Sequence, residues 1–328
     1  FLMAPEHGFA LERQAGEVVG NSEVVGKIAV YSLYGKSRRP DPELLKTIDV
    51  LVFDLQDAGV RCYTYISTMK LAMEVCREVG ITFMVLDRPN PIAPLPASGF
   101  VLESDFESFV GAAELPFIHG MTVGEIATWL QQRDYPDLSL QVVRMSGYRH
   151  GLFADQLQGY RFRPPSPNLR DFDTLLLYPA TVMLEATAVS EGRGTEAPFK
   201  QFGAPFIDSA ALLSELEACL LPGVELHRVS FIPSSSKFAG IECHGIRLAL
   251  TDRAAFNPFM TQTAILLALQ KLYPDQLGID RSFFDKLAGT NRYRRMIVKQ
   301  KPIEKILDAA RRGVRKFTEK NTDRFLYP

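Results

Sequence analysis

The sequence predicts an α/β protein: a Rossmann-like open, mostly parallel sheet with helices on both faces, plus a smaller C-terminal α+β auxiliary domain. Two apolar runs, 50–54 (VLVFD) and 81–87 (ITFMVLD), each end in aspartate and are typical of buried parallel strands. Between them, apolar residues at three- and four-residue spacing over about 64–79, followed by Gly80, predict an amphipathic crossover helix. This βαβ unit indicates a sheet whose crevice lies outside the carboxyl ends of its strands.

The rest of the first part continues the alternation of strands and helices. Thr122 and Glu125 form a capping-box pattern that predicts the start of a helix, and 138–145 (LSLQVVRM) predicts the next strand. The apolar run 174–179 (TLLLYP) predicts a further buried strand. Residues 1–3 (FLM) are typical of the end of a buried strand, so we expect that the first βα unit of this domain is missing from the chain.

After about residue 205 the pattern becomes that of an α+β domain. The sequence predicts helices at 208–220 and 258–273, alternating strands at 224–231 and 242–250, and a basic helix from Pro302. We therefore divide the chain into a Rossmann-like domain, 1–205, and an auxiliary domain, 206–328.

Composition excludes several classes of partner. The 328 residues are 46% hydrophobic, and 37 Lys and Arg against 38 Asp and Glu give a net charge of −1. Because we find no block of like charges, we expect no nucleic acid and no anionic membrane as partner. No stretch approaches the roughly 18 apolar residues of a membrane span. A small molecule or a neutral polymer is the predicted partner.

Familiar catalytic motifs are absent from the sequence. It contains no Walker A loop, no GxGxxG at the start of a helix, no GxSxG elbow and no HExxH. The four cysteines, Cys62, Cys76, Cys219 and Cys243, form no CxxC pair, and buried free thiols are favoured over a disulfide. We therefore expect no nucleotide cofactor, no serine nucleophile and no zinc site of these types.

Two short glycine-rich segments carry the leading candidates for catalysis. Glu6 and His7 stand in the segment PEHG directly after the first strand, and Glu191 and Arg193 stand in SEGRGT at 190–195. Glycines of this kind let backbone approach a ligand closely. The structural alternatives are an exposed loop acid with a capping histidine at Glu6, and an ion pair in a tight turn at Glu191 and Arg193.

Further polar residues gather where other strands end. They are Asp54, Arg61, Tyr63, Tyr65, Asp87, Arg88, Asn90 and His119. Arg61 and the tyrosines suit a sugar that bears a carboxylate, although a structural pair of Asp54 with Arg61 is an equal alternative. His119 stands near a predicted helix start, where it serves either as a cap partner or as a ligand-binding group.

Two kinds of hydrolytic site fit these residue types. Glycoside hydrolysis needs an acid for the leaving oxygen, together with a carboxylate or the substrate's own acetamide at the sugar carbon. Glu6 and Glu191 supply such groups. A metal-centred hydrolase built on His7, Asp54, Asp87 and His119 is the alternative, although no spacing singles it out. A non-catalytic glycan- or peptide-binding protein on the same scaffold is a third hypothesis.

A dozen ordered motifs resemble those of one family, the NamZ-type exo-β-N-acetylmuramidases, formerly a group of unknown function. The resemblance runs from Ala4 to Pro328 and rests on APEHGF, YSLYG with RRP, IDVLVFDLQDAGVRCYTYISTM, VLDRPNP, SFVGAAELPFIHGMTVGE, PPSPNL, LLYPATVMLEATAVSEGRGTEAPFKQFGAPFID and FIPSSSKFAGIECHGI. It implies a Rossmann-like catalytic domain, an auxiliary domain and an active site between them. The implied reaction releases β-1,4-linked N-acetylmuramic acid from the non-reducing end of peptidoglycan fragments such as MurNAc-GlcNAc, without cofactor or metal, in an exported protein.

The resemblance also assigns residues to roles. Glu6 is the implied acid/base and Glu191 the second carboxylate. The implied substrate-binding residues are His7, Arg61, Tyr63, Tyr65, Asp87, Arg88, Asn90, His119 and Arg193, and we add Lys237, whose charge suits the lactyl carboxylate. The chain departs from the family pattern at Cys62, at 93–94 and at Ala188, and the last of these bears on substrate preference.

Overall fold

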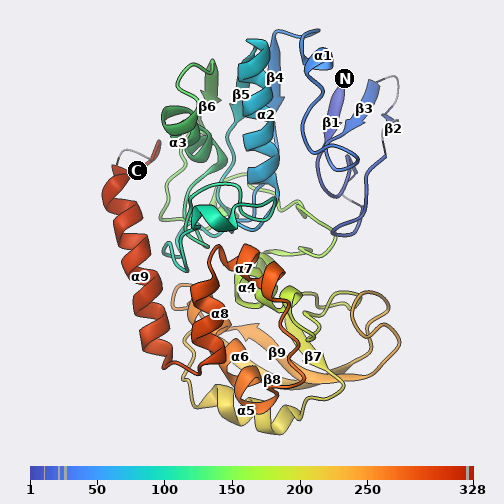
Figure 1. Ribbon diagram of the computed structural model, residues 1–328, viewed down its shortest axis with the longest axis vertical. Helices are drawn as coiled ribbons and strands as arrows, with labels where there is room; N and C mark the ends of the chain where they lie inside the picture. Colours follow the sequence, from blue (N-terminus) through green and yellow to red (C-terminus); the bar gives the residue numbers. More distant parts are fainter. Residues whose placement is uncertain (11, 21–22, 26–27, 323–324) are drawn as a thin grey trace.

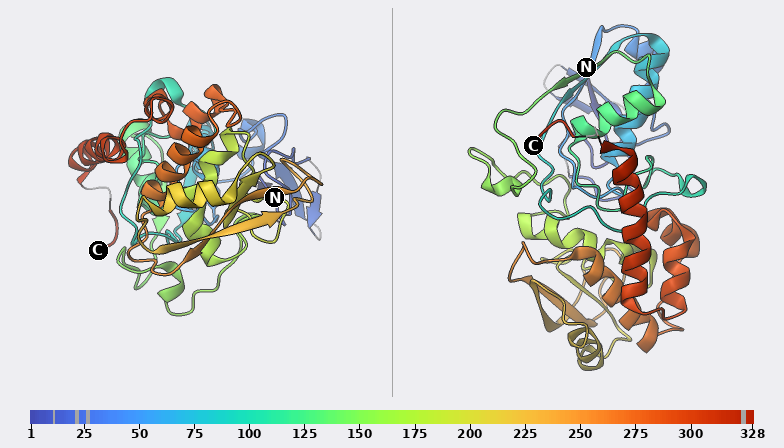
Figure 2. Two further views of the ribbon diagram at one scale, coloured as in Figure 1. Left: turned by 90° about the horizontal axis from the view of Figure 1, so that it is seen from below. Right: turned by 90° about the vertical axis from the view of Figure 1, so that its left-hand side faces the viewer.

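A computed structural model describes residues 1–10, 12–20, 23–25, 28–322 and 325–328. Two parts are stacked along the longest axis of the molecule, and the last long helix runs beside both (Figure 1). The side view in Figure 2 shows the same arrangement, with the C-terminal helix lying across the junction. Buried apolar side chains of both parts belong to one continuous core, so the two parts pack directly on each other.

The first part contains two three-stranded sheets. The first has the order β1-β3-β2 and the second the order β4-β5-β6. Their strands and the helices of this part are β1 (Leu2–Ala4), β2 (Glu23–Val25), β3 (Ile28–Ser32), α1 (Pro42–Leu45), β4 (Val50–Phe53), α2 (Tyr65–Val79), β5 (Thr82–Leu86), α3 (Val123–Asp134) and β6 (Leu140–Val143). We expected a single open sheet, and the described hydrogen-bond ladders divide it in two.

The predicted βαβ unit is confirmed. β4 and β5 pair in parallel, β5 and β6 do the same, and α2 crosses between β4 and β5. Gly80 ends α2 in the left-handed conformation, with φ of 77°, a conformation that glycine adopts at no steric cost. The capping box of Thr122 and Glu125 at the start of α3 is also present. The α/β class with parallel strands is therefore correct.

The sheet β4-β5-β6 is less buried than we expected. α2 and α3 contact each other and both pack on β4-β5-β6, which places them on one face of it. Val50, Val52 and Val143 of the edge strands β4 and β6 are exposed. The prediction that these apolar runs are buried on both faces was therefore wrong for the edge strands, and in the described residues helices cover one face of this sheet.

The second part is built on an antiparallel sheet of order β7-β9-β8. Its elements are α4 (Phe172–Thr181), β7 (Gln201–Ala204), α5 (Ser209–Glu217), β8 (Val224–Phe231), β9 (Cys243–Leu250), α6 (Pro258–Leu272), α7 (Arg281–Ala288), α8 (Asn291–Val298) and α9 (Ile303–Lys320). Short 3₁₀ turns lie at Ser104–Phe106, Ala154–Gln156 and Val182–Ala186. The predicted helices and strands of the α+β domain are confirmed, while α7 and α8 were not predicted. β7, which lies before the predicted boundary in the sequence, pairs with β9 of the second part. The division of the chain at 205–206 stays a prediction.

The run 174–179 is not a strand. It lies within α4, whose first turn is capped by Asp171, the side chain of which accepts from the backbone N–H of Thr174. All side chains from Thr174 to Thr181 are buried, so the helix shows no polar face in the sequence. Over six residues, the apolar pattern of a helix that is buried on all sides cannot be distinguished from that of a buried strand, and this explains the wrong prediction.

Arg61 joins the two parts from inside the core. Its guanidinium is fully buried and donates to the carbonyl oxygens of Phe100 at 2.7 Å, Leu115 at 2.9 Å and Leu287 at 3.0 Å. Leu287 belongs to α7, whereas the other two acceptors lie in the first part. Burial lowers the pKa of Arg61 to about 10, so the side chain is still cationic at neutral pH. The prediction that Arg61 binds substrate is not supported, because its hydrogen bonds are structural.

We expect Arg61→Met to lower the free energy of unfolding by about 4 kcal/mol, because it removes three hydrogen bonds that a buried cation donates to backbone carbonyl groups. Urea unfolding followed by circular dichroism measures this loss. Arg311→Met, on the exposed face of α9, is the matched control and should change stability by less than about 0.5 kcal/mol. Equal losses in the two variants would contradict a structural role for Arg61.

Candidate active site

A cavity of about 720 Å³ lies between the two parts. Six of the predicted catalytic and substrate-binding residues line it: Glu6, His7, Tyr63, Glu191, Arg193 and Lys237. The turn after β1 and the start of α2 supply one wall, and the segment that follows α4 and the loop 235–237 supply the other. The two segments PEHG and SEGRGT, about 185 positions apart in the sequence, therefore meet at one cavity.

Glu6 is held by two neutral donors. Its side chain is 6% exposed, Oε1 accepts from the backbone N–H of Gly16 at 2.9 Å, and Oε2 accepts from the hydroxyl of Thr64 at 2.6 Å. Thr64 is the N-cap residue of α2, yet its hydroxyl makes no capping bond. A threonine at this position ordinarily caps the helix with its hydroxyl, whereas the hydroxyl of Thr64 donates to Glu6 instead.

His7 fixes the turn that carries Glu6. Its backbone has φ of 76°, a strained conformation for a residue with a side chain. Nδ1–H donates to the carbonyl oxygen of Arg13 at 2.8 Å, which leaves Nε2 as the acceptor of the neutral ring. Burial lowers the pKa of His7, so the ring is neutral at pH 7. His7 therefore positions Glu6 without adding a positive charge beside it.

Tyr34 faces the same carboxyl group. It lines the cavity, and its pKa is raised first by burial and next by the charge of Glu6. The phenol therefore keeps its proton at neutral pH and can serve as a hydrogen-bond donor. Tyr34 belongs to YSLYG, one of the motifs that carry the family resemblance, and is a cavity residue that the sequence-based prediction missed.

Glu191 lies opposite in a cluster of four charges. Its side chain is 2% exposed, with Oε1 at 3.1 Å from Nε of Arg193 and Oε2 at 3.1 Å from Nζ of Lys237. Arg193 also reaches Glu185, with Nη2 to Oε1 at 2.5 Å. Each carboxylate of this cluster thus has a cation partner, as buried charges require.

Lys237 is engaged with the wall of the cavity. Besides Glu191, its ammonium donates to the carbonyl oxygens of Leu184, Glu185 and Val189 at 2.8 to 3.2 Å. Lys237 does reach in from the second part, as predicted. Its hydrogen bonds are nevertheless taken up by the segment 184–191, which does not favour the predicted contact with a substrate carboxylate.

The glycines of SEGRGT have a different role from the one we predicted. Gly192 and Gly194 have φ of 81° and 78°. A Cβ on Gly192 would lie 2.7 Å from the carbonyl oxygen of Gln201, and one on Gly194 would lie 2.5 Å from that of Ser235. These glycines allow close approach of the chain to its own backbone rather than to a ligand, and they hold Arg193 at the cavity.

Glu185 was missed in the sequence. It lines the cavity, and its side chain is 20% exposed. Burial raises the pKa of Glu185, although the positive charge of Arg193 opposes this shift. The available signal was an acid within the apolar stretch ATVMLEATAV, since a charge in such a stretch requires a partner.

The two tyrosines after Arg61 lie at different depths. Tyr63 lines the cavity, while Tyr65 is buried behind it. Both hydroxyls donate to the carbonyl oxygen of Pro165, at 2.7 and 3.1 Å. Tyr65 also lies 3.4 Å from the carbonyl oxygen of Glu6. Tyr65 thus supports the wall and the turn at Glu6, and its predicted contact with substrate is not supported by this geometry.

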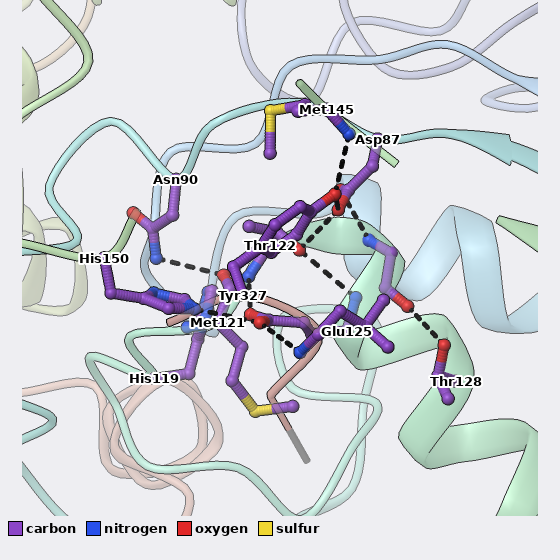
Figure 3. A network of polar contacts seen from close by, with 12 residues as sticks. Asp87, Asn90, His119, Met121, Thr122, Glu125, Thr128, Met145, His150 and Tyr327 are labelled. Atoms are coloured by element: carbon purple, nitrogen blue, oxygen red, sulfur yellow. Dashed lines mark hydrogen bonds and ion pairs between the residues drawn. The ribbon is translucent and has the colours of Figure 1, made fainter. Parts of the chain in front are cut away.

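Asp87 and Arg88 lie away from the cavity. The carboxylate of Asp87 accepts from the hydroxyls of Thr122 at 2.8 Å and Tyr327 at 2.7 Å, so it ties the chain end to the start of α3 (Figure 3). Arg88 forms an exposed ion pair with Asp54. Their predicted role in substrate binding is not supported, because these partners are structural and neither residue lines the cavity.

Asn90 and His119 belong to the same interior region (Figure 3). Asn90 donates from Nδ2 to the carbonyl oxygen of Met121 at 3.0 Å, and His119 accepts at Nδ1 from the N–H of Met121 at 3.2 Å. Nε2 of His119 lies 3.3 Å from Oδ2 of Asp57. Both residues are buried and neither lines the cavity, so substrate binding by them is not supported.

The residues proposed for a metal centre do not converge. Asp54 pairs with Arg88, Asp87 lies beside Tyr327, and His119 lies beside Asp57. Over the described ranges, no group of three or more His, Cys, Asp and Glu side chains is placed to hold a metal ion. Ala188, the departure from the family pattern that bore on substrate preference, does not line the cavity.

Comparison with known proteins gives consistent matches over the chain. Family models described as the N-terminal and C-terminal parts of the exo-beta-N-acetylmuramidase NamZ match residues 1–173 and 176–327. A curated relative, the peptidoglycan beta-N-acetylmuramidase NamZ of Bacillus subtilis (strain 168), is 41% identical over 329 residues, which cover 99% of this chain and 79% of the relative. In the described residues, no helix is long and apolar enough to cross a membrane.

Two solved structures share the fold. Both are DUF1343 family proteins from Bacteroides fragilis. One has a TM-score of 0.89 at 32% identity and covers 99% of this chain and 85% of its own, and the other has a TM-score of 0.76 at 28% identity and covers 92% and 80%. The two-part α/β architecture is therefore common to these proteins.

We predict that Glu185 makes stability fall as pH rises. Because the pKa of folded Glu185 is raised above its ordinary value of 4.5, the folded state binds this proton more tightly than the unfolded chain. Its contribution is fully present below pH 4.5 and is lost as pH rises through the folded pKa. Urea unfolding from pH 4 to 8 should show this fall in the wild type and a smaller one in Glu185→Gln.

Glu196→Gln is the matched control, because the side chain of Glu196 is fully exposed. This variant should keep the pH dependence of the wild type. If Glu185→Gln and Glu196→Gln have the same profile of unfolding free energy against pH, the assignment to Glu185 is wrong.

Proposed function

Because the chain belongs to the NamZ family of exo-β-N-acetylmuramidases, we infer that it is a peptidoglycan glycosidase that releases N-acetylmuramic acid. We propose that it cleaves the β-1,4 bond of a non-reducing terminal N-acetylmuramic acid in fragments such as MurNAc-GlcNAc. The observation that carries the assignment of the site is the buried carboxyl group of Glu6, held by neutral donors at a cavity that a second carboxylate also lines.

Glu6 is the proposed acid/base. Thr64 and Gly16 orient its two oxygens, and His7 beside it is neutral. The two donors that hold this carboxyl group are uncharged, so it can carry a proton to the leaving oxygen and later remove one from water. Tyr34 supplies a further donor at the same end of the cavity.

Glu191 is the proposed second carboxylate. Both of its oxygens face cations, Arg193 and Lys237, which keep it in place. A carboxylate held in this way suits the stabilisation of positive charge at the sugar carbon. Attack on that carbon is then left to the acetamido group of the substrate or to water.

The lactyl carboxylate of the sugar needs a cation that is not already paired. Arg38 and Lys286 line the cavity, and neither has a carboxylate partner in the described part of the chain. The guanidinium of Arg38 lies over the ring of Phe109 at 4.1 Å, which holds it at the cavity. We therefore assign the lactyl group to Arg38 and Lys286 instead of Lys237.

The substrate also suggests where the protein works. Peptidoglycan lies outside the cytoplasmic membrane, so we propose that the protein is exported to the periplasm or the cell surface. Cell fractionation with antibodies against the protein tests this, and recovery in the cytoplasmic fraction alone would contradict it.

Glu6→Gln should lower kcat by about 10²- to 10⁴-fold on an aryl β-N-acetylmuramide, since it removes the transferable proton and keeps the shape of the side chain. Release of the chromophore measures turnover, and an aryl β-N-acetylglucosaminide run beside it tests for the lactyl group. Glu12→Gln, an exposed exchange of the same kind outside the cavity, should be as active as the wild type.

The same assay separates the alternatives. Turnover that survives a chelator supports a metal-independent glycosidase, whereas loss with chelator and recovery with a divalent ion would favour a metal-dependent hydrolase. If folded protein turns over neither sugar but binds muropeptides, and Glu6→Gln binds them equally well, the protein is a glycan-binding protein and not an enzyme.

Thr64→Val should lower kcat by about 10-fold with KM unchanged, because Glu6 loses the donor that orients Oε2. Thr64→Ser keeps the hydroxyl and should restore most of the rate. If Thr64→Ser is as slow as Thr64→Val, the hydroxyl is not the reason for the loss and the positioning role is wrong.

A further inference from the structure

A second cavity of about 700 Å³ lies between α3, α9 and the segment 100–114. It is separated from the first cavity by the segment 104–112, which contributes to both: Ser108 and Phe109 line the first, and Ser104 and Glu107 line the second. Figure 1 shows α9 at the edge of the molecule, with its end beside α3. The second cavity contains none of the residues assigned to the reaction.

The charge of the chain is strongly uneven around this cavity. Residues 292–320 contain eleven Lys and Arg against three Asp and Glu, an excess of eight positive charges. The whole chain has a net charge of −1, so all other residues together carry nine excess negative charges. The near-neutral total of the whole chain therefore includes a positive region at α8 and α9, in line with the basic helix that the sequence predicts from Pro302.

The acids that line the second cavity are all neutralised. Glu103 lies 3.6 Å from Arg292, Glu107 lies 2.5 Å from Lys70, and Glu114 lies 3.3 Å from Arg133. These pairs leave little negative charge to attract cations or to repel anions. The electrostatics of the cavity are then set by its remaining charged side chains.

Three of those side chains are cations without a carboxylate partner in the described residues: Arg312, Lys316 and Lys320. They recur every four residues on α9, so they form a row along one face of the helix, with successive members about 6 Å apart along the axis. All three are exposed. We define them as the α9 row.

We propose that the α9 row binds the carboxylates of a muramic-acid glycan strand whose terminal sugar occupies the first cavity. This inference rests on the proposed function. Each muramic acid of a peptide-free strand carries a lactyl carboxylate, so such a strand presents a row of negative charges to a row of positive ones. A strand that leaves the first cavity across the segment 104–112 meets the second cavity directly. The protein then favours strands over disaccharides.

The kinetic test compares a long and a short substrate. Wild type and Arg312→Ala/Lys316→Ala/Lys320→Ala are assayed on peptide-free glycan strands and on an aryl β-N-acetylmuramide, which is too short to leave the first cavity. For the strands we expect KM to rise about 10-fold with kcat unchanged, through loss of three exposed charge contacts. For the aryl muramide we expect no change. Lys299→Ala/Lys301→Ala/Lys305→Ala is the control with the same loss of charge outside the second cavity.

A binding test is independent of turnover. Isothermal titration calorimetry with the Glu6→Gln protein measures Kd for the same strands and for chitin oligosaccharides of matched length, which carry no carboxylate. The change in the α9 row should weaken strand binding about 10-fold, more so at low salt, and should leave chitin binding unaltered.

Several results would overturn the proposal. One is an equal KM for strands in the wild type and the α9-row variant. Another is a rise in KM in the Lys299, Lys301 and Lys305 control as large as the rise in the α9-row variant. The third is a weakening of chitin binding as large as the weakening of strand binding. Failure of the proposed function looks different: the wild type then turns over neither substrate, while the calorimetry with strands still tests the α9 row.

Discussion

The way in which the two parts of the molecule pack on each other depends on one buried side chain, the guanidinium of Arg61. Arg61 donates to carbonyl oxygens of Phe100 and Leu115 in the first part and of Leu287 in the second. A charged group remains in an apolar interior only where protein hydrogen bonds replace those of water, so each acceptor must stay within reach. Leu287 also lines the active-site cavity, so this hydrogen bond ties one wall of the cavity to the first part of the molecule.

The two carboxyl groups of the cavity stand in contrasting surroundings. Glu6 is bound by a hydroxyl and a backbone amide, whereas Glu191 faces the cations of Arg193 and Lys237. Carboxyl groups in different environments can perform different tasks within one site. The neutral donors leave Glu6 available for proton transfer, and the two cations hold Glu191 in place at the cavity. This asymmetry is the physical basis of the roles that we propose for the two residues.

Much of the secondary structure was predictable because it rests on local patterns. The spacing of apolar residues in α2, the left-handed Gly80 at its end and the capping box of α3 all involve residues close in sequence. The apolar run in α4 was misread, since a helix without a polar face has no periodicity to reveal it. The burial of β4 and the division into two sheets depend on which elements pack together, and periodicity within a segment does not contain that information.

For the site, the sequence by itself determined which segments carry the chemistry. Polar residues in short glycine-rich turns after strands or helices pointed to Glu6 and Glu191, and both line the cavity. Only the tertiary structure decided the roles of Arg61, Asp87 and Lys237. Apart from the backbone N–H of Arg88 beside Asp87, the hydrogen-bond partners of these side chains lie 35 or more positions away. A side chain's function follows from the atoms that surround it, and a local pattern cannot specify atoms brought together by the fold.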